Sequence, residues 1–284
     1  MITVVMTAYN VGQYIEKAIS SVLNSSLKDL ELIIVEDCST DNTKELIEEA
    51  ANKDSRITVI QQPINMGAGW ARRTGIEAAK GDYIITIDAD DYISPDFLET
   101  LYNKAVEHDV DIVCGGVTQL RGDGSYDRNG YGERVVEGDE KVLGLMKERV
   151  PFMNNKLIST SLHKKVPYCT RRFIEDMPTI TKLMYYANKV VYVNNDGYTY
   201  VQRDTSLIHS ADPLKNVLYR FLYLQDIAEF FEKENPEMIK KMNIASTYQY
   251  YLSSLKQVAP TIEQIELYKD DWVEFTRRLI LHNL

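Results

Sequence analysis

The stretch IITIDADDY at residues 84–92 is the part of the chain that most constrains the fold. Its apolar, β-branched first half predicts a buried strand. The strand then runs into three carboxylates within four residues, Asp88, Asp90 and Asp91. Like charges at this spacing disfavour full ionisation unless something positive binds among them. The stretch therefore predicts a sheet strand that presents an acidic turn at its carboxyl end.

The acidic turn favours a divalent cation. Oxygen donors suit hard cations, and Mg²⁺ in particular takes one or two carboxylates together with water and substrate phosphates. A phosphate-bearing partner is therefore expected beside the metal. The alternative is a turn without a metal that leads into a helix, because Ser94 and Pro95 are typical of a helix cap and a first helical residue. The residues of the turn alone leave both interpretations open.

Strands and helices alternate in the segments that precede this turn. Apolar runs predict strands at 1–6, 32–35 and 57–60, and apolar residues at helical spacing predict helices within 14–22, 46–51 and 68–79. Such alternation indicates a parallel sheet with right-handed crossovers. Polar clusters follow three of the strands, at 7–10, 36–39 and 88–91. Because ligands bind beyond the carboxyl ends of such strands, we expect the three clusters to meet at one edge.

The alternation fades in the second half of the chain. A further strand is expected at 111–117, followed by an irregular stretch rich in Gly, Asp and Tyr at 121–132. Residues 212–258 and 260–282 are expected to be mainly helical, with Pro260 breaking the run. The chain is therefore divided into three segments, 1–115, 116–211 and 212–284.

Composition limits the partners and the compartment. Thirty-two Lys and Arg against 42 Asp and Glu give a net charge of −10, which argues against extended nucleic-acid binding. Cys38, Cys114 and Cys169 lack the spacing of a zinc site and favour a reducing compartment. The sequence shows neither a leader nor an apolar stretch of membrane-spanning length. We therefore expect a cytoplasmic protein, with peripheral contact to the inner face of the cell membrane left open.

Four motifs occur in one order and spacing along the first part of the chain. They are VVMTAYN at 4–10, VEDCSTD at 35–41, NMGAGWARRTG at 65–75 and DADD at 88–91. On these motifs the chain resembles the family 2 glycosyltransferases of the GT-A fold, closely over about the first 115 residues and loosely over 173–209. The resemblance implies an α/β fold with a Rossmann-like, mainly parallel sheet flanked by helices and a mainly helical C-terminal extension.

The resemblance also implies an activity. It predicts an inverting, metal-dependent enzyme of bacterial surface-polysaccharide type that moves a hexosyl unit from a UDP-sugar to a hydroxyl of a glycan or lipid-linked acceptor. Segment 1–115 would bind the nucleotide sugar, and segment 116–211 would form the acceptor side and carry the catalytic base. The C-terminal segment leaves open a homodimer contact or a membrane-surface contact.

Site residues follow from the motifs. Asp37 would accept the imide N–H of uracil, a donor that cytosine lacks; its alternative role is to cap the following helix, although Asp41 is better placed for that. Arg73 stands where the family has Asn. Two alternatives therefore stay open for Arg73: a role in the site, or a position on the exposed face of the helix. The implied donor-binding residues are Thr7, Ala8, Tyr9, Asp37, Arg72, Asp88, Arg203 and Ser206, and the implied ligands of Mn²⁺ or Mg²⁺ are Asp90, Asp91 and His209.

The catalytic base is expected in the sequence RRFIEDMP at 171–178, which resembles the family's Glu-Asp motif. Asp176 matches the base by position, with Glu175 as the second candidate, because inversion needs a group that accepts the proton of the acceptor hydroxyl. The structural alternative is that both residues simply open a helix at 178–187 and favour its positive end.

Two other functions compete with sugar transfer. The acidic turn also looks like the DxD motif of haloacid-dehalogenase-type phosphatases, although that family needs the motif on its first strand. A non-catalytic nucleotide-sugar-binding partner is the second alternative. A dinucleotide oxidoreductase is disfavoured, because the first turn at 7–12 contains no GxGxxG.

Overall fold

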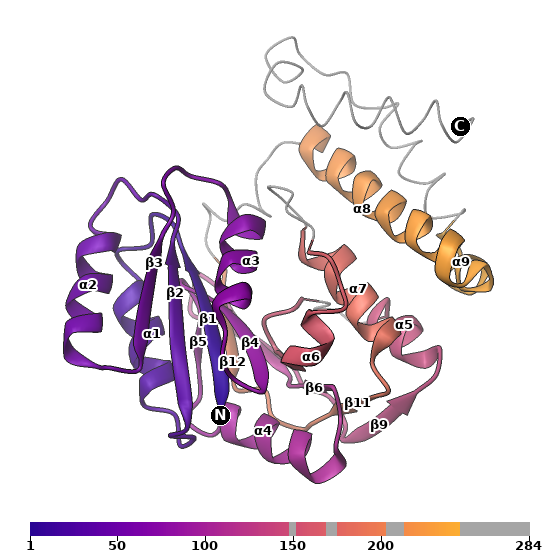
Figure 1. The fold of residues 1–284 in the computed structure, drawn as a ribbon, viewed down its shortest axis with the longest axis horizontal. Coiled ribbons are helices and arrows are strands. Elements are labelled where there is room, and N and C mark those ends of the chain that lie inside the picture. The colour runs from indigo at the N-terminus through magenta and orange to yellow at the C-terminus, as the bar shows by residue number, and fades with distance from the viewer. Residues whose placement is uncertain (148–151, 169–174, 203–212, 245–284) are drawn as a thin grey trace. The chain divides into compact units, whose positions relative to one another are not determined.

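The computed structural model describes residues 1–147, 152–168, 175–202 and 213–244. The chain divides into two compact units, Met1–Asp204 and Thr205–Leu284. The larger unit is a large sheet flanked by helices, which confirms the predicted α/β class (Figure 1). The functional subdivision of the chain near residue 115 stays a prediction.

The larger unit is built on an eight-stranded sheet in which β3, β2, β1 and β4 are neighbours in that order and all parallel. Each of these strands overlaps the apolar run predicted for it. β1, which lies between β2 and β4, is buried on both faces, as expected for a parallel strand covered by helices. The strands are β1 (Ile2–Ala8), β2 (Leu30–Glu36), β3 (Ile57–Gln61) and β4 (Tyr83–Asp88).

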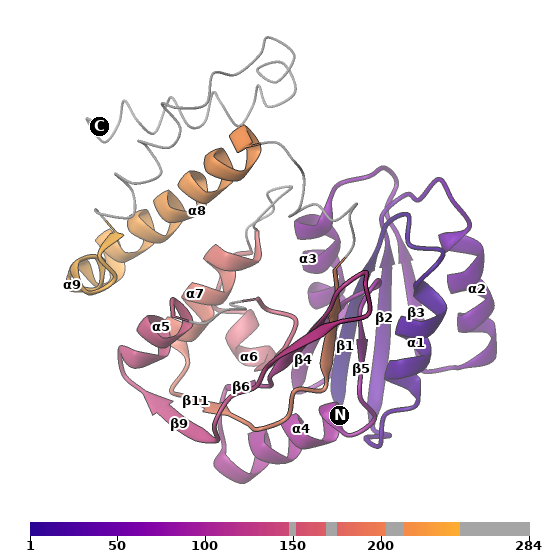
Figure 2. The same ribbon diagram turned by 180° about the vertical axis from the view of Figure 1, so that it is seen from behind.

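Helices cover both faces of these four strands (Figures 1 and 2). α1 and α2 share one hydrophobic cluster with one face of the sheet, whereas α3 packs on the other face. α3 approaches β1 closely at Gly75, where an added Cβ would lie 2.3 Å from Cγ1 of Val5. The helices are α1 (Ile15–Leu23), α2 (Thr43–Lys53) and α3 (Ala68–Ala78).

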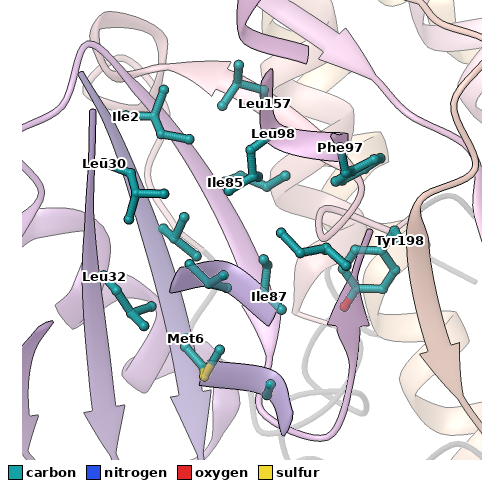
Figure 3. Packing of buried hydrophobic residues seen from close by; sticks show 14 of the residues in the cluster. Ile2, Met6, Leu30, Leu32, Ile85, Ile87, Phe97, Leu98, Leu157 and Tyr198 are labelled. Carbon is teal, nitrogen blue, oxygen red and sulfur yellow. The ribbon is translucent and has the colours of Figure 1, made fainter. Parts of the chain in front are cut away.

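The main core lies between the sheet and helices α1, α2 and α4 (Phe97–His108). Alternation along β1 sends Ile2 and Met6 into this core and Val5 into a smaller cluster against α3. Full burial of one such side chain contributes about 1.5–3 kcal/mol. Figure 3 shows part of this core, with residues from both halves of the larger unit: Ile2, Met6, Leu30, Leu32, Ile85, Ile87, Phe97, Leu98, Leu157 and Tyr198.

Beyond β4 the sheet becomes mixed. β10 lies antiparallel between β4 and β6, β11 is parallel to β6, and β9 is antiparallel to β11 at the edge. The segment that leads into β10 is therefore a neighbour of the acidic turn at the end of β4. The strands are β6 (Ile112–Cys114), β9 (Arg134–Glu137), β10 (Lys156–Ser159) and β11 (Lys189–Tyr192). The helices of this part are α5 (Glu140–Leu145), α6 (Thr160–His163) and α7 (Asp176–Tyr186).

The prediction of one continuous strand at 111–117 is wrong. The chain forms β6, then leaves the large sheet at Gly115 and Gly116, and enters a second sheet as β7. The N–H groups of these glycines donate to the carbonyls of Asn155 and Asn195, so the break is held by backbone hydrogen bonds. The second sheet also uses residues expected to be irregular, and its strands are β5 (Tyr92–Ile93), β7 (Val117–Leu120), β8 (Tyr126–Asn129) and β12 (Tyr198–Val201).

The described part of the smaller unit is helical, in agreement with the prediction. It consists of α8 (Pro213–Glu234) and α9 (Pro236–Lys241), which are separated at Asn235. The helix expected at 260–282 lies outside the described residues. Among the residues that the structure describes, no helix is both long and apolar enough to cross a membrane.

Candidate active site

The carboxyl ends of β1, β2 and β4 form one edge of the large sheet. Thr7 is paired with Val35 of β2 and with Asp88 of β4, and Ala8 is paired with Glu36. The three polar clusters predicted to converge therefore do so. The reason is the parallel register, which brings the last residue of each strand to the same level.

Hydrogen bonds tie the loop after β1 to the loop after β2. Asn10, in the left-handed region with φ of 52°, accepts the N–H of Thr40 and donates its own N–H to the hydroxyl of Ser39. The buried carboxylate of Glu36 accepts the N–H of Ser39 at 2.6 Å. Tyr9 precedes Asn10 and is 45% exposed. These hydrogen bonds hold the two loops together, and the ring of Tyr9 beside them stays accessible to solvent.

Asp37 is buried and supports the start of α3. Its two carboxylate oxygens accept the N–H groups of Met66 and Gly67, each at 2.8 Å. Gly67 is the cap residue of α3 and has φ of 88°, a conformation that suits glycine. The suggestion that Asp37 caps the helix that follows it is therefore wrong, because Asp41 accepts the N–H of Thr43 at the start of α2.

The acidic turn gathers the carboxylates of Asp88, Asp90 and Asp91. One oxygen of each lies within 4.8 Å of the others, and the turn is closed by a hydrogen bond from the N–H of Asp91 to the carbonyl of Asp88. Asp88 and Asp90 are half-buried, whereas Asp91 is buried. Hard-oxygen donors at this spacing fit a divalent cation such as Mg²⁺ or Mn²⁺.

Asp91 joins the turn to the second sheet. Its carboxylate accepts the hydroxyl of Tyr198 at 2.5 Å and the N–H of Val201 at 2.9 Å, both from β12. Burial raises the pKa of Asp91 well above its usual value, and the charges of Asp90 and Asp88 raise it further. The sequence implies that Asp91 ligates the metal, whereas these contacts favour a role in supporting the loop.

Arg72 connects the acidic turn to the predicted catalytic segment. It is buried on α3, and its guanidinium pairs with Glu175 and, at 3.4 Å, with Asp88. Burial lowers the pKa of Arg72, but the carboxylates of Glu175 and Asp88 raise it by more, so the group stays charged. Arg72 therefore holds β4 and the start of α7 together through two ion pairs.

Asp176 lies beside this ion pair at the start of α7. Desolvation raises its pKa to about 7; the charge of Glu175 acts in the same direction, whereas Arg72 opposes it. A carboxylate with a pKa near 7 is suited to accept a proton at neutral pH. Glu175 is buried against Arg72, which favours a positioning role for it. Both residues also open α7, as the structural alternative expected.

Two contacts at the site were not predicted from the sequence, although Tyr198 begins the segment that carries the predicted phosphate neighbours Arg203 and Ser206. Asn154 donates to Asp88 at 2.6 Å, and Tyr198 donates to Asp91. Neither contact has a local signal, because the partners are 66 and 107 residues apart in the chain. Arg203, Ser206 and His209 lie outside the described residues.

Arg72 and Arg73 provide a matched test of the ion pairs. Arg73 is 41% exposed and pairs with Glu77 on the same helix, so its surface role is the one observed. We expect Arg72→Lys to lower the free energy of unfolding by about 2–4 kcal/mol, because one ammonium cannot span two carboxylates. Arg73→Lys should change it by less than about 0.5 kcal/mol. Urea unfolding measures both, and equal effects of the two changes would contradict the bridging role.

Comparison with known sequences places the chain in a family. Residues 3–174 match the family model for glycosyl transferase family 2. The chain is 27% identical over 287 residues to the glycosyltransferase GlyG of Streptococcus pneumoniae, with 95% of this chain and 93% of GlyG covered. It is 30% identical over 217 residues to GlyA of the same organism, covering 72% of this chain and 31% of the length of GlyA.

Solved structures show the same fold. TarS of S. aureus, residues 1–349 in complex with UDP-GlcNAc, gives a TM-score of 0.65 at 20% identity, with 96% of this chain and 78% of that chain covered. The mannosyltransferase PcManGT of Pyrobaculum calidifontis, in complex with GDP-Man and Mn²⁺, gives 0.60 at 15% identity, with 96% and 79% covered. The chain belongs to glycosyltransferase family 2 and is a transferase with the GT-A fold.

Proposed function

We propose that the protein moves a hexosyl unit, with inversion, from a UDP-sugar to a hydroxyl group of a glycan or lipid-linked acceptor in surface-polysaccharide synthesis. One observation carries this proposal. Arg72 joins a cluster of three carboxylates at a sheet edge to the start of α7, where Asp176 has a pKa of about 7. The arrangement supports a cation site and a proton acceptor in one region, the two groups that metal-dependent inverting transfer uses.

The donor is proposed to lie across the carboxyl edge of β1, β2 and β4. Thr7, Ala8 and Tyr9 would border the nucleobase, and Asp37 would accept the uracil imide N–H. Each carboxylate oxygen of Asp37 has a second lone pair beyond the one used by the backbone of Met66 or Gly67. The complex of TarS with UDP-GlcNAc, a protein of the same fold, supports a UDP-sugar as the donor class.

The cation is proposed to be held by Asp90, with Asp88 beside it. Both carboxylates are half-buried and therefore reach the surface of the turn. A bound Mn²⁺ or Mg²⁺ would supply charge stabilisation for the departing diphosphate. Mn²⁺ in the complex of PcManGT supports this proposal. Asp91 would support the turn through its hydrogen bonds with Tyr198 and Val201.

Asp176 is proposed as the general base. As the acceptor oxygen forms its bond to the anomeric carbon, the bond to the diphosphate oxygen breaks, and the diphosphate leaves with the electron pair. Asp176 takes the proton of the acceptor hydroxyl in the same step. Arg72 and Glu175 would fix the start of α7 so that this carboxylate faces the reacting carbon.

Several sequence-based assignments stay predictions. Arg203 and Ser206 as phosphate neighbours and His209 as a metal ligand are among them, as are a cytoplasmic location, a peripheral membrane contact and a homodimer. Family membership favours transfer over the phosphatase and the non-catalytic binding partner.

Donor and metal are tested by thermal unfolding with UDP, GDP, CMP or dTDP, each with and without Mn²⁺. A ligand that binds only the folded state raises stability by about 2.7 kcal/mol at a hundredfold excess over Kd, or roughly 5–10 °C in Tm. We expect UDP with Mn²⁺ to give the largest shift. Asp90→Asn should lose the Mn²⁺-dependent part of that shift.

Asp82→Asn is the control for this experiment, because Asp82 is 77% exposed and directly precedes β4, at the end of that strand away from the acidic turn. It should retain the full Mn²⁺-dependent shift. A larger response to GDP or dTDP would overturn the donor assignment, and a full shift in Asp90→Asn would overturn the metal assignment.

The base is tested by the pH dependence of kcat. Below the Asp176 pKa of about 7, kcat should fall by about tenfold per pH unit, because only the ionised carboxylate accepts the proton. Asp176→Asn should lower kcat by about 10²–10⁴-fold and remove this pH dependence. Glu175→Gln should lower kcat and keep a pH dependence whose midpoint moves to lower pH, because the charge of Glu175 raises the pKa of Asp176. The opposite pattern would assign the base to Glu175.

The same pKa predicts a change in stability that does not depend on activity. The folded-state pKa of Asp176 is raised, so its contribution to stability is fully present below about pH 4 and is lost as the pH rises to about 7. Urea unfolding should therefore show the stability of Asp176→Asn increasing relative to wild type between pH 4 and pH 7. A constant difference over this range would contradict the raised pKa.

A further inference from the structure

Asn154 contacts Asp88, the first carboxylate of the acidic turn. Its Nδ2 donates to Oδ2 of Asp88 at 2.6 Å, whereas Arg72 approaches the other oxygen of Asp88 at 3.4 Å. Asn154 is 8% exposed, compared with 36% for the side chain of Asp88. The amide is therefore the closer of these two partners of the carboxylate, and both partners are buried.

The sheet places Asn154 at this position. β10 is antiparallel to β4, with Ile158 opposite Ile84 and Ser159 opposite Tyr83. Asn154 lies in the turn directly before β10, and the antiparallel direction of β10 brings this turn to the end of β4 that carries Asp88. The N–H of Lys156 donates to the carbonyl of Met153 and closes the turn, so the contact is made by a buried, hydrogen-bonded turn anchored to the sheet.

Thr86 determines which way the amide of Asn154 points. The Thr86 hydroxyl donates to Oδ1 of Asn154 at 3.0 Å, so the Nδ2 group is directed at Asp88. Thr86 and Asp88 are two residues apart on β4 and share one face of the sheet. A reversed amide would place its oxygen against the carboxylate, where neither group can donate. Thr86 is 3% exposed, so water does not compete readily for this hydrogen bond.

A neutral amide has a specific advantage here. Asp88 lies close to Asp90 and Asp91, whose charges repel it and favour other side-chain rotamers. Asn154 opposes that displacement with a hydrogen bond that adds no positive charge, so the attraction of Asp88 for a cation is retained. Partners that orient ligand side chains from behind a metal typically change affinity by about 10–100-fold when removed.

We propose that Asn154, held by Thr86, is a positioning residue that fixes Asp88 for binding of the donor with its cation. The proposal rests on the proposed function, since it requires a cation at the acidic turn. It assigns a role to two residues outside the four motifs of the sequence. It also gives Asp88 two distinct supports, a neutral one from the turn before β10 and a charged one from Arg72.

The test compares Mn²⁺ affinity in the presence of saturating UDP, by titration calorimetry, for the full-length wild type and variants. We expect Asn154→Ala to weaken Mn²⁺ binding by about 10–100-fold while leaving the affinity for UDP without metal unchanged. Thr86→Val keeps the shape and β-propensity of Thr86 but cannot donate, and it should act in the same direction by a smaller factor. Asn155→Ala is the matched control.

Asn155 is the sequence neighbour of Asn154 and is also buried, but its amide donates to the carbonyl of Gly115. Asn155→Ala should therefore lower Tm and leave Mn²⁺ affinity unchanged. Wild-type Mn²⁺ affinity in folded Asn154→Ala would overturn the positioning role alone. If Asn154→Ala does not fold, unchanged affinity in Thr86→Val overturns it. A wild type that binds no Mn²⁺ with UDP would overturn the proposed function and the positioning role together.

Discussion

The site depends on one buried interaction, the pairing of Arg72 with carboxylates from two distant parts of the chain. Asp88 ends the fourth strand and Glu175 precedes α7, yet both meet the same guanidinium on α3. An arginine is suited to this position because its planar fork serves two acceptors and its charge survives burial. Removing one partner of such a buried set leaves an uncompensated charge, so the three elements are held in one arrangement.

The charge balance around Arg72 explains the chemistry proposed for this edge. Arg72 supplies one positive charge to a region that contains the carboxylates of Asp88, Asp90, Asp91, Glu175 and Asp176. Desolvation raises the pKa of Asp176 and the excess of negative charge raises it further; the same excess favours binding of a cation at the half-buried carboxylates. The same imbalance therefore serves both the proton acceptor and the proposed metal. Asp91 belongs to the same region: burial and the charges of Asp90 and Asp88 raise its pKa, while two hydrogen bonds from β12 hold its carboxylate in place.

Local sequence patterns predicted the first half of the fold well and the second half poorly. β1 to β4 and α1 to α3 follow from apolar periodicity, and their parallel order brings the polar clusters together without further information. The Gly115–Gly116 pair is a local signal for a break, but the hydrogen bonds to Asn155 and Asn195 that hold the break join residues far apart in the sequence. The contacts of Asn154 with Asp88 and of Tyr198 with Asp91 were not predicted, because each joins residues far apart in the chain. Asp37 was predicted as a site residue, but its hydrogen bonds to the N–H groups of Met66 and Gly67 before α3 were not, because they join residues about 30 positions apart in the chain.

The most direct measurement is a crystal structure with UDP and Mn²⁺ in which anomalous scattering locates the manganese. We expect the manganese peak at the carboxylate of Asp90, between the turn and the diphosphate, with Arg72 still paired with Glu175 and with Asp176 facing the sugar side of the diphosphate. A manganese peak away from the acidic turn, or an Arg72 side chain detached from both carboxylates, would contradict the central role of this interaction.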